Sequence, residues 1–330
     1  MSKVLITGVA GLLGSHFSRH LLDKGHVVYG IDNYSGGYSD FVDPRVKMRA
    51  IDLQKTQMVD GVFAACKPDY VYHFAAYAAV GLSPFIRNYN YMNNVVASAN
   101  VINGCVNHGV KKIIFTSSMD VYGSAYEPPY TEDMRPVPED PYGIAKFAVE
   151  QDLAAAGRLF DLRYSIVRPH NVFGVYQNIW DKYRNVLGIW IRQILSGQPM
   201  TIYGDGEQVR SFSDIVFYME PFEKLMEAGE GEVYNIGADQ YVTINQAADT
   251  MRNIARKHGF NPTIIHLEAR DEVKSAYCDH AKAKIHLKFN DDTNLDELLD
   301  KMFVWASNQP QRQIKNMPYE IEKNMYSYWK

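Results

Sequence analysis

The sequence predicts an α/β fold built on a doubly wound parallel sheet, with a smaller C-terminal α/β region beside it. Three observations predict this fold. Short apolar runs alternate with helix-like segments, a glycine-rich turn follows the first run, and an acidic residue, Asp32, follows the second. Alternating strands and helices form parallel sheets because each helix carries the chain back across one face of the sheet.

The first elements form a strand, a tight turn, a helix and a second strand. Lys3–Thr7 is a short run rich in β-branched residues that ends at a glycine. Leu12–Leu22 repeats apolar residues at helical spacing, and Gly25 ends the helix. His26–Ile31 is the second predicted strand, and Asp32 follows it. This order is typical of Rossmann-type sheets that bind dinucleotides.

The later strands divide the chain into two predicted regions. Asp69–Phe74, Lys112–Thr116 and Leu162–Val167 are further strands, with helical segments between them. We therefore predict a dinucleotide-binding domain over residues 1–174. The pattern then becomes irregular, which predicts a substrate-binding region over residues 175–330.

Part of this second region is predicted to return to the sheet. Phe222–Glu227 has a helical pattern and Glu232–Gly237 has the pattern of a strand. Residues 212–238 are therefore expected to rejoin the first domain.

Composition favours a protein that acts on small molecules. The chain has 330 residues, is 46% hydrophobic and carries a net charge of -4 without any run of Lys or Arg, so neither nucleic acid nor a membrane surface is a predicted partner. No stretch approaches the ~20 apolar residues of a membrane span, and the start lacks a signal core, so a cytoplasmic location is expected. Cys66, Cys105 and Cys278 lack paired or metal-ligand spacing, which predicts core residues and no metal site.

The glycine-rich turn predicts a dinucleotide site. Gly8 permits the tight turn, Gly11 lets the backbone approach a pyrophosphate, and Gly14 lets the helix pack on the strand. The helix N-terminus then faces the phosphates. The Asp32 carboxylate can accept both ribose hydroxyls and would repel a 2′-phosphate, which favours NAD over NADP. Further candidates for contacts with adenine, backbone and ribose are Asp52, Leu53, Phe74, Ala75, Ala76 and Asn94.

Tyr142 and Lys146 form a candidate catalytic pair. They lie four residues apart on a predicted helix, so both face the same side. A free phenol titrates near ~10, and the Lys146 ammonium together with a bound oxidised nicotinamide is expected to lower that pKa. Tyr142 would then act as a base at neutral pH.

The ordered motifs of the chain resemble the extended short-chain dehydrogenase/reductase family, specifically its nucleotide-sugar epimerases, and are most similar to the UDP-glucose 4-epimerases. Motif order and spacing match most closely over residues 1–215. The motifs are Thr7–Gly14, Asp32–Asn33, His73–Ala76, Ser117–Ser118, Val121–Gly123, Tyr142–Lys146 and Arg168–Gly174.

The resemblance implies NAD-dependent epimerisation at C4 of a UDP-hexose. Ser118 would bond the sugar 4-hydroxyl, Tyr142 would take its proton, and Lys146 would hold the nicotinamide ribose. C4 would give its hydride to tightly bound NAD, and the transient 4-keto sugar would turn over and take it back on the opposite face. Additional cofactor contacts implied by the motifs are Leu12, Leu13, Asn33, Ser117 and Pro169.

The resemblance also implies a set of UDP-sugar contacts in residues 175–330 and just before them. Arg210 is the best candidate for the diphosphate, because it lies in a matching Gly-Asp-Gly…Arg-x-Phe loop and a guanidinium binds phosphate in two places. Arg270 resembles a second arginine of the family but lies one position out of register. The remaining candidates are Asn171, Asn185, Val186 and Tyr203.

The sequence leaves the reaction and the sugar open. Family dehydratases need an Asp-Glu pair where this chain has Met119 and Asp120, so dehydration is disfavoured. Ala276 stands where small-hexose epimerases carry a tyrosine, which leaves room for an N-acetyl group and makes UDP-N-acetylglucosamine a candidate substrate. Two further hypotheses are another nucleotide-sugar reaction of the same family, either 3,5-epimerisation, dehydration or reduction, and a non-catalytic NAD-binding regulator.

Three further expectations concern packing. The helices near 93–108 and 143–159 resemble the pair that forms a homodimer in the family. His73 and His170 are expected to be packed, hydrogen-bonded histidines. Asp181–Arg184 is expected to be a solvated loop, with contact between Arg184 and the nucleotide as the weaker alternative.

Overall fold

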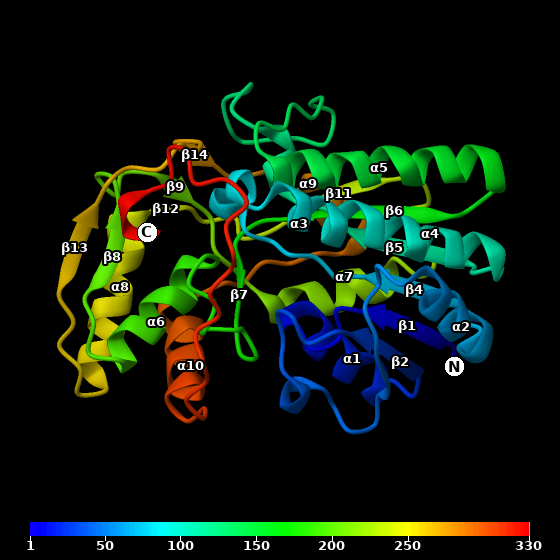
Figure 1. Cartoon of the computed structure of the whole chain (residues 1–330), viewed down its shortest axis with the longest axis horizontal. Coiled ribbons are helices and arrows are strands. Elements are labelled where there is room, and N and C mark those ends of the chain that lie inside the picture. Colours follow the sequence, from blue (N-terminus) through cyan, green and yellow to red (C-terminus); the bar gives the residue numbers. More distant parts are fainter. Residues whose placement is uncertain (330) are drawn as a thin grey trace.

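A seven-stranded parallel sheet forms the centre of the larger lobe in the computed structural model, which describes residues 1–329 (Figure 1). The strands lie in the order β11-β6-β5-β4-β1-β2-β3, and every neighbouring pair is parallel. The order reverses between β1 and β4, where ligands of doubly wound sheets bind. The predicted fold class is confirmed. The strands are β1 (Lys3–Thr7), β2 (Val27–Asp32), β3 (Lys47–Ala50), β4 (Tyr70–His73), β5 (Lys112–Thr116), β6 (Tyr164–Pro169) and β11 (Val233–Ile236).

Helices cover both faces of this sheet. One face packs against α1 (Leu12–Asp23), α7 (Met219–Lys224) and α9 (Ala281–Leu287), with Phe17 and Phe222 in the buried layer. The other face packs against three helices whose buried residues include Phe63 and Val101. These are α2 (Thr56–Cys66), α4 (Ala97–Asn107) and α5 (Pro141–Phe160).

The smaller lobe has its own apolar core around Trp190 and Met251. Its helices are α6 (Val186–Leu195), α8 (Ile244–Lys257) and α10 (Leu295–Ser307). Its strands pair as β8 (Met200–Tyr203) with β13 (Ile264–Leu267), and as β9 (Val209–Arg210) with β12 (Val242–Thr243) and β14 (Ser275–Ala276). A bridge of β7 (Val172–Phe173) with β10 (Ser213–Asp214) lies between the lobes (Figure 1).

Short helices complete the described chain. A π-helical segment, Met92–Val96, joins α3 (Arg87–Tyr91) to α4. Single 3₁₀ turns cover Ser39–Phe41, Val80–Phe85, Met119–Tyr122, Ile215–Tyr218 and Ser327–Trp329. Within residues 1–329, every helix is too short or too polar to span a bilayer.

After Gly174 the chain comes back to the sheet twice. The first return brings α7 and β11, and β11 pairs with β6. The second brings α9, whose Ala283 and Leu287 are fully buried against the sheet core. Sequence reasoning did not anticipate α9 or the edge strand β3, because both are short and only partly apolar. The predicted division at residues 174 and 175 remains a proposal.

Candidate active site

The glycine-rich turn brings the backbone of β1 against that of β4. Gly8 has φ +72°, and a Cβ atom there would lie 2.7 Å from the amide nitrogen of Ala75. A Cβ at Gly14 would overlap the carbonyl oxygen of Gly8. Only glycine therefore fits at position 8 and at position 14. No side chain caps α1 at Gly11, so the first-turn N–H groups point toward the switch point, where they can bind an anion.

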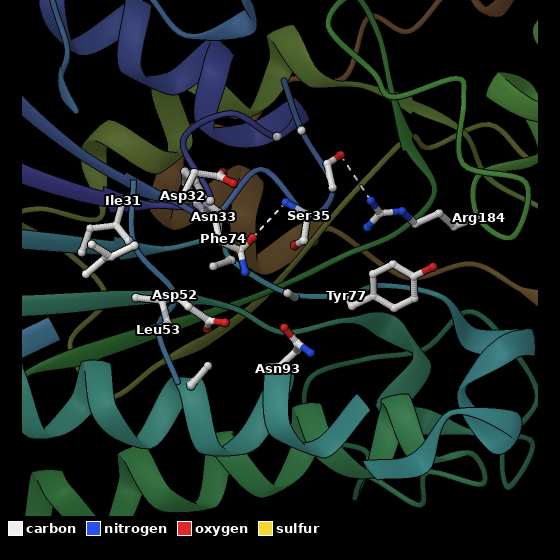
Figure 2. Close-up of a pocket in the computed structure, with 18 residues that line it drawn as sticks. Ile31, Asp32, Asn33, Ser35, Asp52, Leu53, Phe74, Tyr77, Asn93 and Arg184 are labelled. Carbon is white, nitrogen blue, oxygen red and sulfur yellow. Dashed lines mark hydrogen bonds between the residues drawn. The ribbon is translucent and has the colours of Figure 1, made fainter. Parts of the chain in front are cut away.

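A pocket opens beside this turn at the carboxyl ends of β1, β2 and β4 (Figure 2). Many of the predicted cofactor residues line it, together with several that sequence reasoning missed. The predicted ones are Gly8, Gly11, Asp32, Asn33, Asp52, Leu53, Phe74, Ala75 and Ala76. The others are Ile31, Ser35, Gly36, Gly37, Ile51, Tyr77, Asn93, Ala97 and Arg184. The consecutive glycines Gly36 and Gly37, soon after Asp32, could have indicated from the sequence that this loop lines the pocket.

Asp32 is fixed at the rim of the pocket by backbone hydrogen bonds. Its carboxylate accepts from the N–H of Ala10 at 3.0 Å and from the N–H of Tyr34 at 2.7 Å. Burial raises its pKa, although these hydrogen bonds act in the opposite direction. Each oxygen keeps a lone pair for a ribose hydroxyl. The geometry fits a dinucleotide with a free 2′-hydroxyl.

Replacing Asp32 with Ser is expected to weaken NAD binding about 10- to 100-fold, because hydrogen bonds to a charged group are lost. Isothermal titration calorimetry with NAD and NADP measures this. The exposed α5 residue Asp152, changed in the same way, serves as the control. Unchanged NAD affinity in Asp32→Ser would remove Asp32 from the cofactor site.

Some predicted cofactor residues lie outside the pocket lining. The Asn94 side chain is buried and bonded to both backbone groups of Tyr77, accepting from its N–H at 2.8 Å and donating to its carbonyl at 3.1 Å. Asn94 thus fixes Tyr77, and its neighbour Asn93 reaches the pocket. Leu12 and Leu13 pack against the sheet core, so only their backbone can face a phosphate.

The segment predicted to be a solvated loop is buried, so that expectation is wrong. Asp181 is 2% exposed and Tyr183 is 3% exposed. Arg184 forms an ion pair with Asp181 at 2.8 Å and lines the pocket. The charged residues pair with each other and pack under the C-terminal residues, which sequence reasoning had not placed. The polar sequence of residues 181–184 alone therefore led to the wrong prediction that this segment is exposed to solvent.

Helix α5 presents Tyr142 and Lys146 side by side. Asp140 caps the helix, accepting from the N–H of Tyr142 at 2.8 Å and of Gly143 at 3.2 Å. Both Tyr142 and Lys146 are buried, and the Lys146 Nζ atom lies 5.9 Å from the centre of the Tyr142 ring. Lys146 also donates to the carbonyl of Thr116 at 2.7 Å, at the end of β5. Ser118 follows two residues later and is hydrogen-bonded to Tyr142.

The protein's own groups do not make Tyr142 a base at neutral pH. Burial raises the pKa of Tyr142, and the carboxyl groups of Asp120 and Asp140 raise it further, while the hydrogen bond with Ser118 lowers it. Burial also lowers the pKa of Lys146 to about 7, with Glu150 acting in the opposite direction. The spacing of Tyr142 and Lys146 therefore predicted that the two side chains lie together, but it did not predict the pKa of Tyr142.

A buried polar network supports the residues around this pair. Arg168 and Glu150 form an ion pair at 2.6 Å, and their side chains are 4% and 3% exposed. Ser117 donates to Glu150 at 2.5 Å, and Arg168 donates to the hydroxyl of Tyr122 at 2.9 Å. Ser117, predicted to touch the cofactor, is thus also tied to α5. Pro169 ends β6 immediately after Arg168.

The predicted substrate residues fall into two groups. The side-chain amide of Asn171 donates to Ser211, and that of Asn185 donates to Val172 and its oxygen caps α6, so both amides hold loops. Val186 begins α6 and packs against the core of the smaller lobe.

The second group lies around the loop before β14, with Arg270 on that loop, Arg210 on β9 and Tyr203 at the end of β8. The Arg210 guanidinium pairs with Glu272 at 2.9 Å and donates to the carbonyl of Val273 at 2.7 Å. The Arg270 guanidinium lies 3.5 Å from the centre of the Tyr203 ring, so these two predicted residues do meet. The charge of Arg210 is already balanced by a carboxylate.

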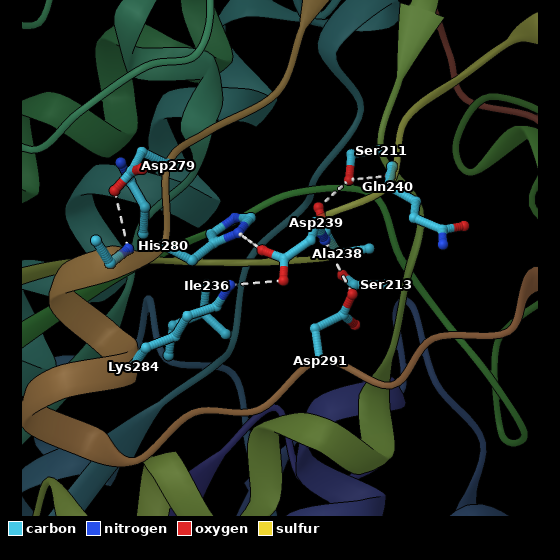
Figure 3. A network of polar contacts seen from close by, with 12 residues as sticks. Ser211, Ser213, Ile236, Ala238, Asp239, Gln240, Asp279, His280, Lys284 and Asp291 are labelled. Carbon is cyan, nitrogen blue, oxygen red and sulfur yellow. Dashed lines mark hydrogen bonds and ion pairs between the residues drawn. The ribbon is translucent and has the colours of Figure 1, made fainter.

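The two histidines predicted to be structural are buried and hydrogen-bonded, as expected. His73 contacts the Thr7 hydroxyl at 2.7 Å through Nδ1. Nε2 of His170 lies 2.9 Å from Nε2 of His280. Figure 3 shows the other side of this ring, where Nδ1 of His280 lies 3.0 Å from the Asp239 carboxylate. Burial lowers the pKa of His170 to about 3. This network fixes the loops after β6 and β11.

The fold and site together define the class of protein: a dinucleotide-dependent enzyme of the short-chain dehydrogenase/reductase type. Its marks are the glycine turn at the switch point of the sheet, Asp32 after β2, Ser118 after β5, and the Tyr142–Lys146 pair on α5. Residues 4–237 match the model of the NAD dependent epimerase/dehydratase family. The chain belongs to that family and is an enzyme of the epimerase type.

Three relatives illustrate the similarity. A UDP-glucose 4-epimerase from Caenorhabditis elegans is 28% identical, covering 93% of this chain and 98% of the relative. The crystal structure of a UDP-glucose 4-epimerase with UDP-glucose from Thermotoga maritima has a TM-score of 0.86 at 30% identity, covering 92% of this chain and 98% of that one. A UDP-N-acetylglucosamine 4-epimerase from Methanobrevibacter ruminantium, in complex with UDP-N-acetylmuramic acid, has a TM-score of 0.84 at 28% identity over the same shares.

Proposed function

We propose that this enzyme epimerises C4 of a UDP-hexose, interconverting UDP-glucose and UDP-galactose, with tightly bound NAD as its cofactor. The observation that carries the proposal is the trio of partly buried Ser118 with buried Tyr142 and Lys146, at the carboxyl end of β5. Similarity to UDP-glucose 4-epimerases over nearly the full chain supports it.

The residues present fit NAD. The turn at Gly8 and the uncapped start of α1 suit the pyrophosphate, Asp32 suits the adenosine ribose, and Asp52 with Leu53, which line the same pocket, are assigned to adenine. Lys146 is assigned to the nicotinamide ribose. When bound, NAD supplies a hydride acceptor and donor and a positive charge.

Proton transfer is assigned to Tyr142. Its phenolic oxygen takes the O4 proton as C4 is oxidised and returns it when the 4-keto sugar is reduced on the opposite face. Ser118, which bonds to Tyr142, orients the same hydroxyl. Because burial raises the pKa of Tyr142, the positive charge at the ribose side must offset that rise during turnover.

The substrate nucleotide is assigned to the smaller lobe. Tyr203 and Arg270 lie together there, and Arg210, Asn171 and the Asn185–Val186 turn border the same region. A UDP-sugar placed between the lobes would put its sugar near Tyr142 and its diphosphate near the arginines.

An N-acetylated substrate is the first alternative. Ala276 is 9% exposed and belongs to a packed cluster with Met119, Tyr130 and Cys278. The Ala276 side chain occupies less volume than the tyrosine that small-hexose epimerases carry at this position. The similarity to a UDP-N-acetylglucosamine 4-epimerase is consistent with this alternative.

Dehydration is a second candidate, and Asp120 is the observation that favours it. Burial, reinforced by Asp140, raises the pKa of Asp120 well above its usual range, so it can donate a proton near Tyr142. Met119, however, occupies the place of the other acid, which leaves elimination without its second group. We therefore rank epimerisation first.

The test is product identification by proton NMR. The purified protein, without added reductant, is incubated separately with UDP-galactose and UDP-N-acetylgalactosamine. UDP-glucose from the first supports the proposal, and conversion of only the second shifts it to N-acetylhexosamines. A new C6 methyl signal would indicate dehydration, and no conversion of either would contradict 4-epimerisation.

The proposal includes a homodimer and a cytoplasmic location. The helices over 93–108 and 143–159 leave Val96 and Ile144 about two-fifths exposed, at 39% and 40%. Packing these helices against a second copy would cover both residues. Sedimentation equilibrium at the mass of one chain would contradict the dimer, and cell fractionation would test the location.

A further inference from the structure

The last residues of the described chain form a strap between the two lobes, which we define as residues 310–329 (Figure 1). Near its start, Lys315 donates to the carbonyl of Ser35, in the loop that lines the cofactor pocket, at 2.8 Å. Further along, the Glu320 carboxylate accepts from the N–H groups of Asn88 and Tyr89 at 2.7 and 2.8 Å. The strap is thus anchored on the larger lobe.

The end of the strap holds the loop that carries Arg270. The Tyr328 hydroxyl accepts from Arg270 Nε at 3.0 Å, and the Tyr326 hydroxyl accepts from the N–H of Asp271 at 3.1 Å. The Arg270 guanidinium also lies 5.0 Å from the centre of the Trp329 ring and 3.5 Å from the centre of the Tyr203 ring. Aromatic rings and one hydroxyl therefore fix the guanidinium in place.

The Arg270 guanidinium retains hydrogen-bond donors that have no partner within the described chain and can therefore bind a ligand. Among residues 1–329, its Nη2 atom is buried and has no hydrogen-bond partner, and its guanidinium forms no ion pair. Arg210, by contrast, is neutralised by Glu272. A partly buried guanidinium that has an unpartnered nitrogen and no carboxylate beside it favours an anionic ligand. Arg270 is consequently the better receptor for a diphosphate, although the sequence favoured Arg210.

We infer that Tyr328, with Trp329 behind it, is a positioning residue of the substrate site. It engages Nε of Arg270 so that the Nη2 side remains directed to a diphosphate oxygen. This inference rests on the proposed function. Because the strap holds the arginine in advance, it lowers the cost of ordering that side chain when the nucleotide binds. The strap therefore strengthens binding instead of blocking the site.

Tyr328→Phe removes only the hydroxyl and tests this directly. We expect UDP to bind about tenfold more weakly by calorimetry, and KM for the UDP-sugar to rise about tenfold with kcat unchanged. The thermal unfolding temperature and the bound NAD content should match the unaltered protein. Tyr29→Phe, on β2 and remote from the strap, is the matched control.

A double-mutant cycle separates positioning from general packing. In an Arg270→Ala protein, adding Tyr328→Phe should cause no further loss of UDP affinity, because Tyr328 acts through Arg270. Unchanged or tighter UDP binding by Tyr328→Phe, or a full additional loss in the double variant, would overturn the inference while leaving the proposed function intact. Absence of UDP binding by the unaltered protein would overturn both.

Discussion

Changing Tyr142 to Phe is expected to lower kcat by about 10²- to 10⁴-fold, the usual range for loss of a general acid–base group. The phenolic oxygen is the only part removed, and in the proposed reaction it carries the O4 proton both ways. The ring still fills its buried position, so the fold and the cofactor site should remain intact. Initial rates of UDP-galactose conversion measure the loss.

The control for this variant is Tyr241→Phe, since Tyr241 is 54% exposed and lies outside the proposed catalytic trio. Acid release of nucleotide should show equal NAD in both variants. A Tyr142→Phe enzyme with normal kcat would exclude Tyr142 as the base. Normal NAD content with lost turnover is the result that separates chemistry from binding.

Arg168→Met is expected to lower the free energy of unfolding by about 3–5 kcal/mol, because it leaves a buried carboxylate unpaired. Glu150 is 3% exposed and accepts from both Arg168 and Ser117. Urea denaturation followed by circular dichroism measures the change.

Two comparisons make this prediction specific. Arg163→Met breaks an exposed pair with Glu230, whose side chains are 49% and 54% exposed, and should cost no more than about 1 kcal/mol. Combining Arg168→Met with Glu150→Leu should recover much of the loss, because the unpaired buried carboxylate is then removed. Equal effects of Arg168→Met and Arg163→Met would contradict the account.

The sheet and the catalytic geometry were predictable because short-range patterns determine them. Glycines at 8, 11 and 14 mark places where backbone approaches backbone, and a spacing of four places Tyr142 and Lys146 on one helix face. The sequence signal for each relation is local, although Gly8 approaches the distant Ala75 across the sheet.

Helical periodicity could not predict which of Asn93 and Asn94 reaches the pocket. Both lie in the π-helical segment Met92–Val96, whose wider turn shifts the direction of each side chain relative to an α-helix. Asn94 consequently points to the backbone of Tyr77 and Asn93 reaches the pocket.

The strap and the surroundings of the two predicted arginines could not be predicted for a different reason. The environment of Arg270 depends on Tyr203 and Tyr328, which come from distant parts of the chain, and the strap has no regular period. The same long-range packing buries Tyr183, whose hydroxyl lies 2.9 Å from that of Tyr319. Sequence spacing carries no information about such contacts.

The central claim is that the hydrogen removed from C4 returns to C4. The most direct test is turnover of UDP-galactose carrying deuterium at C4, in ordinary water, with product analysis by NMR and mass spectrometry. The account predicts UDP-glucose that retains deuterium at C4. Loss of the label to water, or solvent hydrogen exchanged into C3 or C5 in a reciprocal experiment in heavy water, would contradict it.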